Sequence, residues 1–212
     1  MESRLITALT GIVCLLLGSV SKAGTITISP RDDADVNSIE PDTVQNIYTL
    51  YTGGLSTEIT RSYLKFNLSS IPEGQTIVSA RLRLQPNSFT AVAPVIGAYY
   101  LENDNWSEST LTWNNAPTNF NLLPTDTQTI SFNDAYWAVT GDVELAYGSD
   151  DIYSVILKLT DEGPGTPRRA GFWSKETEFW SPYLSIQYQP IPEPATLVLL
   201  GLGGLILRKR RA

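Results

Sequence analysis

The sequence predicts an all-β domain, an antiparallel β-sandwich, flanked by two terminal targeting segments. Short runs of alternating apolar and polar residues are separated by Gly, Pro, Asn and Asp about every ten residues, a spacing typical of strands with one buried face. Long amphipathic helices are missing, and the one short helical turn expected is Thr140–Ala146, capped by Thr140. Many short strands at this spacing favour two packed sheets.

The first 23 residues have the order of a secretory signal peptide. Arg4 supplies a positive charge, an uncharged run follows over Leu5–Val20, and small residues stand at Ser21 and Ala23. This order predicts cleavage after Ala23 by signal peptidase. An uncleaved N-terminal anchor is the alternative, which the shortness of the apolar run disfavours.

The predicted strands follow one another through residues 24–190. The clearest is Val78–Gln85, in which apolar residues alternate with Arg81 and Arg83, so we expect Val78 on the inner face and the arginines on the outer face. A turn that contains Pro72 precedes this strand. The other predicted strands are Thr25–Ser29, Arg61–Asn67, Val95–Leu101, Leu111–Trp113, Thr127–Phe132, Tyr153–Thr160, Ala170–Trp173 and Tyr183–Tyr188.

Residues 191–212 have the order of a membrane-directed tail, with a Pro-Glu-Pro triplet, an apolar run and a basic cluster. The apolar run Ala195–Leu207 has 13 residues. As a short C-terminal hydrophobic helix it would reach roughly 20 Å, less than the ~30 Å hydrocarbon core, so a temporary stop at the membrane is expected. The basic cluster remains on the cytoplasmic side, which places the domain outside. The triplet and the cluster are Pro192, Glu193, Pro194, Arg208, Lys209, Arg210 and Arg211.

This order of triplet, helix and basic cluster resembles the PEP-CTERM sorting signal of Gram-negative bacteria that make exopolysaccharide. The resemblance implies recognition by an exosortase, a membrane protease–transpeptidase, with cutting near Pro192–Pro194 and transient inner-membrane contact through the helix. It also implies export to the cell envelope, the cell surface or the extracellular matrix of a Gram-negative-type bacterium. A plain C-terminal membrane anchor is the alternative.

The composition of residues 24–190 excludes several classes of function. This segment has 9 Lys and Arg against 20 Asp and Glu, a net charge of −11, while the whole chain has −7. An acidic domain without a basic stripe is a poor candidate for nucleic-acid binding. The chain has no histidine, which excludes imidazole metal sites and Ser-His or Cys-His nucleophiles. Its single cysteine, Cys14, lies in the signal segment, so the domain has no disulfide framework and needs a hydrophobic core.

The domain carries long motifs of a known family. Residues 61–74 (RSYLKFNLSSIPEG) with 78–84 (VSARLRL) resemble the strand–turn signature of the DNRLRE domain, and residues 106–117 (WSESTLTWNNAP) resemble its W-x-E-x-T-x-T-W-N-N-x-P run. Residues 172–176 and 181–186 resemble its closing strands. The family belongs with the disaggregatase-related carbohydrate-binding modules, which implies a jelly-roll-like β-sandwich that binds polysaccharide, in some members alginate. The sequence departs from the family at Arg168-Arg169 and in the loop 163–167.

Exposed aromatic rings are the first candidates for a sugar site, because a pyranose presents an apolar C–H face to a flat ring. We expect Tyr136, Trp137 and Trp180 to supply them. Tyr136 and Trp137 are adjacent, so on an extended chain they point to opposite faces and one can reach solvent. Trp106 and Trp113 are expected instead to pack over the turn of their motif.

Asp32, Asp33 and Asp35 form an acidic cluster after the first predicted strand. Carboxylate oxygens at alternate positions suit a structural Ca²⁺, although the spacing is not that of an EF-hand. A solvated acidic turn is the alternative, and it is favoured.

The sequence thus predicts an exported, exosortase-sorted protein whose sandwich binds polysaccharide without catalysis. A structural matrix protein or adhesin with no specific glycan site is the alternative. A polysaccharide-degrading enzyme is the least favoured reading, because no motif singles out the two carboxylates that glycoside hydrolysis needs.

Overall fold

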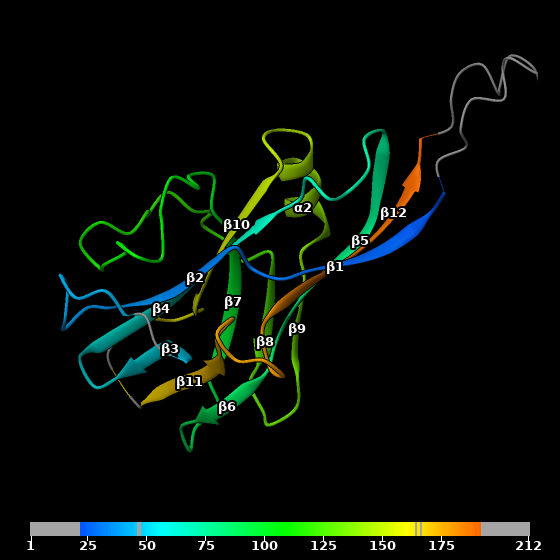
Figure 1. Ribbon diagram of the computed structural model, residues 1–212. Helices are drawn as coiled ribbons and strands as arrows, with labels where there is room; N and C mark the ends of the chain where they lie inside the picture. The colour runs from blue at the N-terminus through cyan, green and yellow to red at the C-terminus, as the bar shows by residue number, and fades with distance from the viewer. Residues whose placement is uncertain (1–21, 46–47, 164, 166, 192–212) are drawn as a thin grey trace, which may run out of the picture.

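The computed structural model describes residues 22–45, 48–163, 165 and 167–191 of the 212-residue chain (Figure 1). This part of the chain is nearly all-β, with two antiparallel sheets of four and eight strands and one short helix, α2 (Thr140–Tyr147). The predicted antiparallel β-sandwich is confirmed. The predicted C-terminal hydrophobic helix, and all but the last two residues of the predicted signal peptide, Lys22 and Ala23, lie outside the described residues.

The four-stranded sheet has the order β1-β12-β5-β9. Its central strand β12 runs antiparallel to both neighbours and pairs Gly24 with Tyr188, so the first and last strands of the domain lie side by side. Figure 1 shows both ends of the described chain on this side of the molecule. The strands are β1 (Gly24–Ile28), β5 (Gln75–Leu84), β9 (Ala135–Ala138) and β12 (Tyr183–Pro190).

The eight-stranded sheet has the order β6-β11-β3-β4-β10-β7-β8, with β2 also paired to β4. β3 and β4 form a hairpin whose loop residues are Ser56 and Thr57. The strands are β2 (Asp32–Asn37), β3 (Thr49–Leu55), β4 (Glu58–Asn67), β6 (Pro86–Phe89), β7 (Val95–Tyr100), β8 (Asp126–Thr129), β10 (Ile152–Leu159) and β11 (Arg168–Trp173).

The main hydrophobic core lies between the two sheets. Leu64 and Phe66 of β4 face it, with Leu82 of β5 and Trp137 of β9 from the other sheet. Trp137 meets Phe172 of β11 edge to face at 6.1 Å between ring centroids. Burying side chains of this size removes a large apolar area from water, and no disulfide is needed to hold the sheets together.

A long loop, residues 101–125, covers the outer face of the eight-stranded sheet and builds a second, smaller core. Trp106 is buried there and meets Tyr63 of β4 edge to face at 5.9 Å. The structural role predicted for Trp106 is therefore confirmed. Leu111–Trp113, predicted as a strand, belongs to this loop and forms no strand.

One predicted inward side chain points to solvent. Val78 is 50% exposed, because the pairing of β5 with β12 shifts by one residue between Gln187 and Tyr188. This bulge brings Ile77 to the inner face in place of Val78. Beyond the bulge the expected alternation is restored, with Leu82 inward.

Thr140 begins the helix α2 but does not cap it. Its hydroxyl accepts a hydrogen bond from the backbone N–H of Ala80 at 3.0 Å, and Val139 occupies the cap position without a side-chain hydrogen bond. Thr140 therefore ties the helix to β5.

In the part of the chain that the structure describes, no helix is long and apolar enough to cross a bilayer. The apolar run 195–207, on which the prediction of a C-terminal hydrophobic helix rests, lies outside the described residues.

Candidate functional site

A row of three side chains crosses the outer face of the four-stranded sheet. The strand register places Tyr183 of β12 opposite Arg83 of β5, and Arg83 opposite Tyr136 of β9. The next row, Leu184, Leu82 and Trp137, lies in the core. Because successive side chains of a strand point to opposite faces, the first row faces away from the core.

Arg83 is the centre of this row and is held from several directions. Its Nη2 donates to Asp134 Oδ1 at 2.8 Å and to Gln85 Oε1 at 2.9 Å, and its Nη1 donates to the carbonyl of Ser181 at 3.4 Å. The guanidinium also lies over the ring of Tyr183, 5.3 Å from its centroid. These contacts fix a flat cation between two aromatic rings.

Tyr136 and Trp180 are exposed, as predicted for ring-stacking residues, with 42% and 49% of their surface accessible. The hydroxyl of Tyr136 donates to Asp134 Oδ2 at 3.2 Å. A hydrogen bond with Tyr183 raises the pKa of Tyr136, so the two rings that flank the arginine are in contact through their hydroxyls. Trp180 directly precedes Ser181, whose carbonyl binds Arg83, so the backbone of Trp180 lies close to the row.

Trp137 is not available for stacking on a sugar. It is fully buried in the core, and its Nε1 donates to the carbonyl of Ile96 at 3.0 Å. The expectation that one of the adjacent pair Tyr136 and Trp137 reaches solvent holds for Tyr136, while the alternation of β9 directs Trp137 inward. We therefore omit Trp137 from the site.

The three aspartates expected to hold calcium lie on a strand, β2, and not in a turn. Asp32 forms an ion pair with Lys65 at 3.4 Å on the outer face. Asp33 and Asp35 are buried on the opposite face, where they pair in register with Leu64 and Ser62. The strand alternation thus separates Asp32 from the other two.

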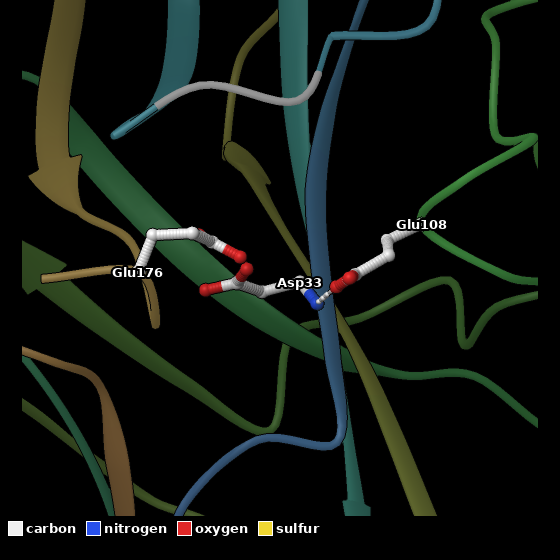
Figure 2. Close-up of side chains that lie close together, drawn as sticks. All are labelled: Asp33, Glu108 and Glu176. Carbon is white, nitrogen blue, oxygen red and sulfur yellow. Dashed lines mark hydrogen bonds between the residues drawn. The ribbon is translucent and has the colours of Figure 1, made fainter.

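A different set of carboxylates does converge. Oxygens of Asp33, Glu108 and Glu176 lie within 4.8 Å of one another, and Figure 2 shows their side chains meeting beside β2. Lys175 provides the counter-charge: its Nζ lies 2.9 Å from Glu108 Oε1 and 2.7 Å from Glu176 Oε1, and its backbone N–H donates to Asp33 Oδ2 at 2.7 Å. Since an ammonium group already bridges two of these carboxylates, the set functions as an ion-pair network that joins β2 to the loop 101–125 and to the segment after β11.

Burial has a large effect on the two inward-facing aspartates. Desolvation raises the pKa of Asp33 to about 7. It outweighs the hydrogen bond from the Lys175 backbone, which by itself would lower that pKa. Desolvation likewise raises the pKa of Asp35 to about 7, against a backbone hydrogen bond from Tyr51. Both groups are therefore half-protonated near neutral pH.

Sequence reasoning missed three members of the outer-face row and its surroundings: Arg83, Asp134 and Tyr183. A partial signal was present, because the alternation of residues 78–85 directed Arg83 outward and Tyr183 opened a predicted strand. The four-residue strand β9 was too short to be recognised, and without it nothing aligned Tyr136 with Arg83. The predicted sorting and processing residues Pro192, Glu193, Pro194, Arg208, Lys209, Arg210 and Arg211 lie outside the described residues.

Comparison with known proteins identifies two families. The profile of carbohydrate-binding module family 96 matches residues 24–188, and that of the PEP-CTERM protein-sorting motif matches residues 190–211. A gellan lyase from Bacillus sp is 24% identical over 186 residues, an alignment that covers 85% of this chain and 7% of the lyase. The chain thus spans only a small part of the length of that relative.

Proposed function

The chain belongs to carbohydrate-binding module family 96, and we propose that it binds polysaccharide on the outer face of its four-stranded sheet, without catalysis. The observation that carries this proposal is the row Tyr136–Arg83–Tyr183 with Trp180 beside it. The aromatic rings can stack on the C–H faces of sugar rings. The carboxylate of Asp134, whose side chain is 30% exposed, can bind hydroxyl groups, while the buried guanidinium of Arg83 holds it in place.

A row that spans three strands suits an extended chain more than a single sugar. Arg83 and Asp134 keep each other in place through a 2.8 Å hydrogen bond, so the polar groups are oriented before any ligand arrives. Such preorganisation lowers the entropy that binding must overcome. We propose that successive sugar units stack on Tyr136 and Tyr183 across the strands.

The tail determines where this binding takes place. The chain carries the PEP-CTERM motif, which indicates export to the cell envelope or surface and supports processing by an exosortase. We propose that signal peptidase removes residues 1–23, that the tail makes transient inner-membrane contact through its apolar helix, and that the producer is a Gram-negative-type bacterium.

We also propose that residues 24–190 form a DNRLRE domain with jelly-roll-like strand connectivity. The mature protein would then bind polysaccharide of the extracellular matrix.

Catalysis is not part of this proposal. The gellan lyase shares with this chain a segment that amounts to 7% of its own length. The carbohydrate-binding family matches residues 24–188 of this chain. We propose that the shared segment is a sugar-binding module of the lyase, so an assay for released unsaturated or reducing ends with this chain is expected to show no product.

Affinity electrophoresis of the full chain in gels that contain individual matrix polysaccharides tests the binding proposal. We expect retention by at least one polysaccharide, and we expect Tyr136→Ala and Trp180→Ala to weaken it roughly tenfold each, in line with the loss of about 1.4 kcal/mol of stacking. Tyr48→Ala is the matched control, because Tyr48 is an exposed tyrosine that precedes β3 in the other sheet. Equal retention of all four proteins would refute the assignment of the face, and no retention by any polysaccharide would refute binding.

Calcium bound by Asp32, Asp33 and Asp35 stays a prediction. The melting temperature before and after addition of EDTA tests it. A fall of several degrees indicates a structural cation, and an unchanged melting temperature counts against one.

A further inference from the structure

One arginine of the domain has no acidic partner. Residues 24–190 contain 9 lysine and arginine side chains, and all of them lie in the part of the chain that the structure describes. Eight of them form an ion pair with an aspartate or glutamate. Arg81 of β5 forms none within the described residues, although the domain has 20 acidic side chains. Its positive charge is therefore available to a ligand.

Arg81 lies on the same outer face as the proposed sugar site, in the next row along the strands. Two positions separate it from Arg83, which is about 6.8 Å along an extended strand. The register pairs Arg81 with Ser185 of β12 on one side and with Ala138 of β9 on the other. Leu82, between the two arginines, is fully buried in the core. The alternation of β5 therefore directs Arg81 away from the core, and its side chain is exposed.

The side chains that flank Arg81 in its row are small. Ser185 and Ala138 are its direct neighbours, and Thr27 of β1 pairs with Ser185 beyond them. The neighbouring row Tyr136–Arg83–Tyr183 carries two aromatic rings instead. A glycan chain that lies on these rings would have Arg81 at its side. Small side chains beside the arginine leave space there for a group that projects from the chain.

The two arginines of β5 differ in the charge that they present. Arg83 is buried and paired with Asp134 at 2.8 Å, so its charge is already compensated. Arg81 is exposed and uncompensated within the described residues. A free guanidinium donates two parallel hydrogen bonds to a planar carboxylate, a geometry that hydroxyl groups do not match. The charge and the geometry of Arg81 therefore favour an acidic group.

A single free cation suits a chain with isolated carboxylates and not a polyuronate. Residues 24–190 have a net charge of −11, so a carboxylate without a local counter-charge is repelled. A chain with a carboxylate on every sugar would bring several such groups to the face, where Arg81 can pair with one. A neutral chain with acidic side groups can bring one carboxylate to the arginine and none elsewhere.

From this geometry we propose that Arg81 forms a subsite for acidic groups, which binds a carboxylate carried by a side group of a neutral polysaccharide chain. This inference rests on the function proposed above, because the chain itself is held on Tyr136 and Tyr183. Arg81 then selects among chains that the aromatic rings alone would accept equally. It also fixes the lateral position of the chain on the sheet.

Affinity electrophoresis of the full chain in gels that contain xanthan tests the subsite, because xanthan has a neutral glucan backbone with carboxylates on its side chains. Carboxyl-reduced xanthan is the matched probe, with the same backbone and no charge. We expect native xanthan to retain the protein about fivefold more strongly, as for one exposed charge-assisted contact.

Equal retention by the two forms, or stronger retention by the reduced form, would overturn the subsite and leave sugar binding intact. No retention by either form would overturn it as well. The function proposed above would then stand only if another polysaccharide retains the protein.

Variants assign the preference to one side chain. We expect Arg81→Gln to lower retention by native xanthan to the level of the reduced form, and Arg81→Lys to keep part of the difference. Arg31→Gln is the matched control, because it removes the same charge from an exposed arginine that precedes β2, a strand of the other sheet. An equal loss in Arg31→Gln and Arg81→Gln would show that net charge sets the preference, and would refute the subsite. Melting temperatures equal to that of the wild type check that both variants fold.

Discussion

At the scale of single residues, the pair Asp33 and Asp35 makes stability depend on pH. Each is nearly inaccessible on the inward face of β2, and burial raises each pKa to about 7. In the unfolded chain an aspartate has a pKa of about 3.9, so the unfolded state releases these protons first as the pH rises. The stabilisation is complete below about pH 4 and is lost as the pH rises to about 7.

We therefore expect the free energy of unfolding of the wild type to fall by at least about 2 kcal/mol between pH 4 and pH 8, relative to the double variant Asp33→Asn, Asp35→Asn. The amides keep the shape of the side chains and carry no titrating group. Urea titrations at several pH values in the presence of EDTA measure the difference. Glu178→Gln, which removes an exposed carboxylate, serves as the control, and parallel pH curves for wild type and double variant would contradict the burial argument.

At the scale of the elements, Gly53 decides whether β3 can pair with β11. It has φ +125°, and a Cβ atom at this position would lie 2.1 Å from the carbonyl oxygen of Arg168. Alanine would therefore strain the backbone and push against a neighbouring strand that cannot easily move. We expect Gly53→Ala to lower the free energy of unfolding by on the order of 2–3 kcal/mol.

Gly141 provides the matched comparison, because it lies in helix α2 with nothing within 4 Å of an added Cβ. We expect Gly141→Ala to raise the free energy of unfolding by about 0.5–1 kcal/mol, through the lower entropy of the unfolded chain. Denaturant midpoints of the two variants measure both effects. A Gly53→Ala protein as stable as the wild type would show that β3 and β11 pair differently.

Some of the strands could be predicted from the sequence alone, and others could not. β4, β5, β10 and β12 were predictable, because each has eight or ten residues and contains several β-branched or aromatic side chains. β2 was missed because its sequence DDADVN lacks the usual strand composition, and its acids are tolerated only through partners such as the Lys175 backbone, distant in sequence. The short strands β6 and β9 have four residues each, too few to show a period.

The candidate site was predictable to a similar degree. Tyr136 and Trp180 were found from their residue type alone, and both are exposed. Trp137 was indistinguishable from them, because only the register of β9 against β5 decides which of two adjacent rings faces the core. Arg83 could be placed on the outer face, but the contacts that hold it come from two distant segments, at Asp134 and at 181–183.

At the scale of the whole molecule, charge determines which polysaccharides can approach. Residues 24–190 carry a net charge of −11. A polyanionic chain is repelled over long range, and salt shortens that range to about 8 Å at physiological ionic strength. We expect retention by alginate to increase as salt is added, while retention by a neutral polysaccharide stays constant. Affinity electrophoresis over a salt series measures this, and a fall in alginate retention would show that local basic groups outweigh the net charge.

The side-by-side pairing of β1 and β12 has a mechanical consequence. The tail continues from β12, which has β1 on one side and β5 on the other. Ladder hydrogen bonds run across the strands, so a pull on the tail along β12 loads two ladders in shear, and many bonds must break together. If the tail links the domain to the cell, drag on the cell passes through the strand that is bonded on both edges.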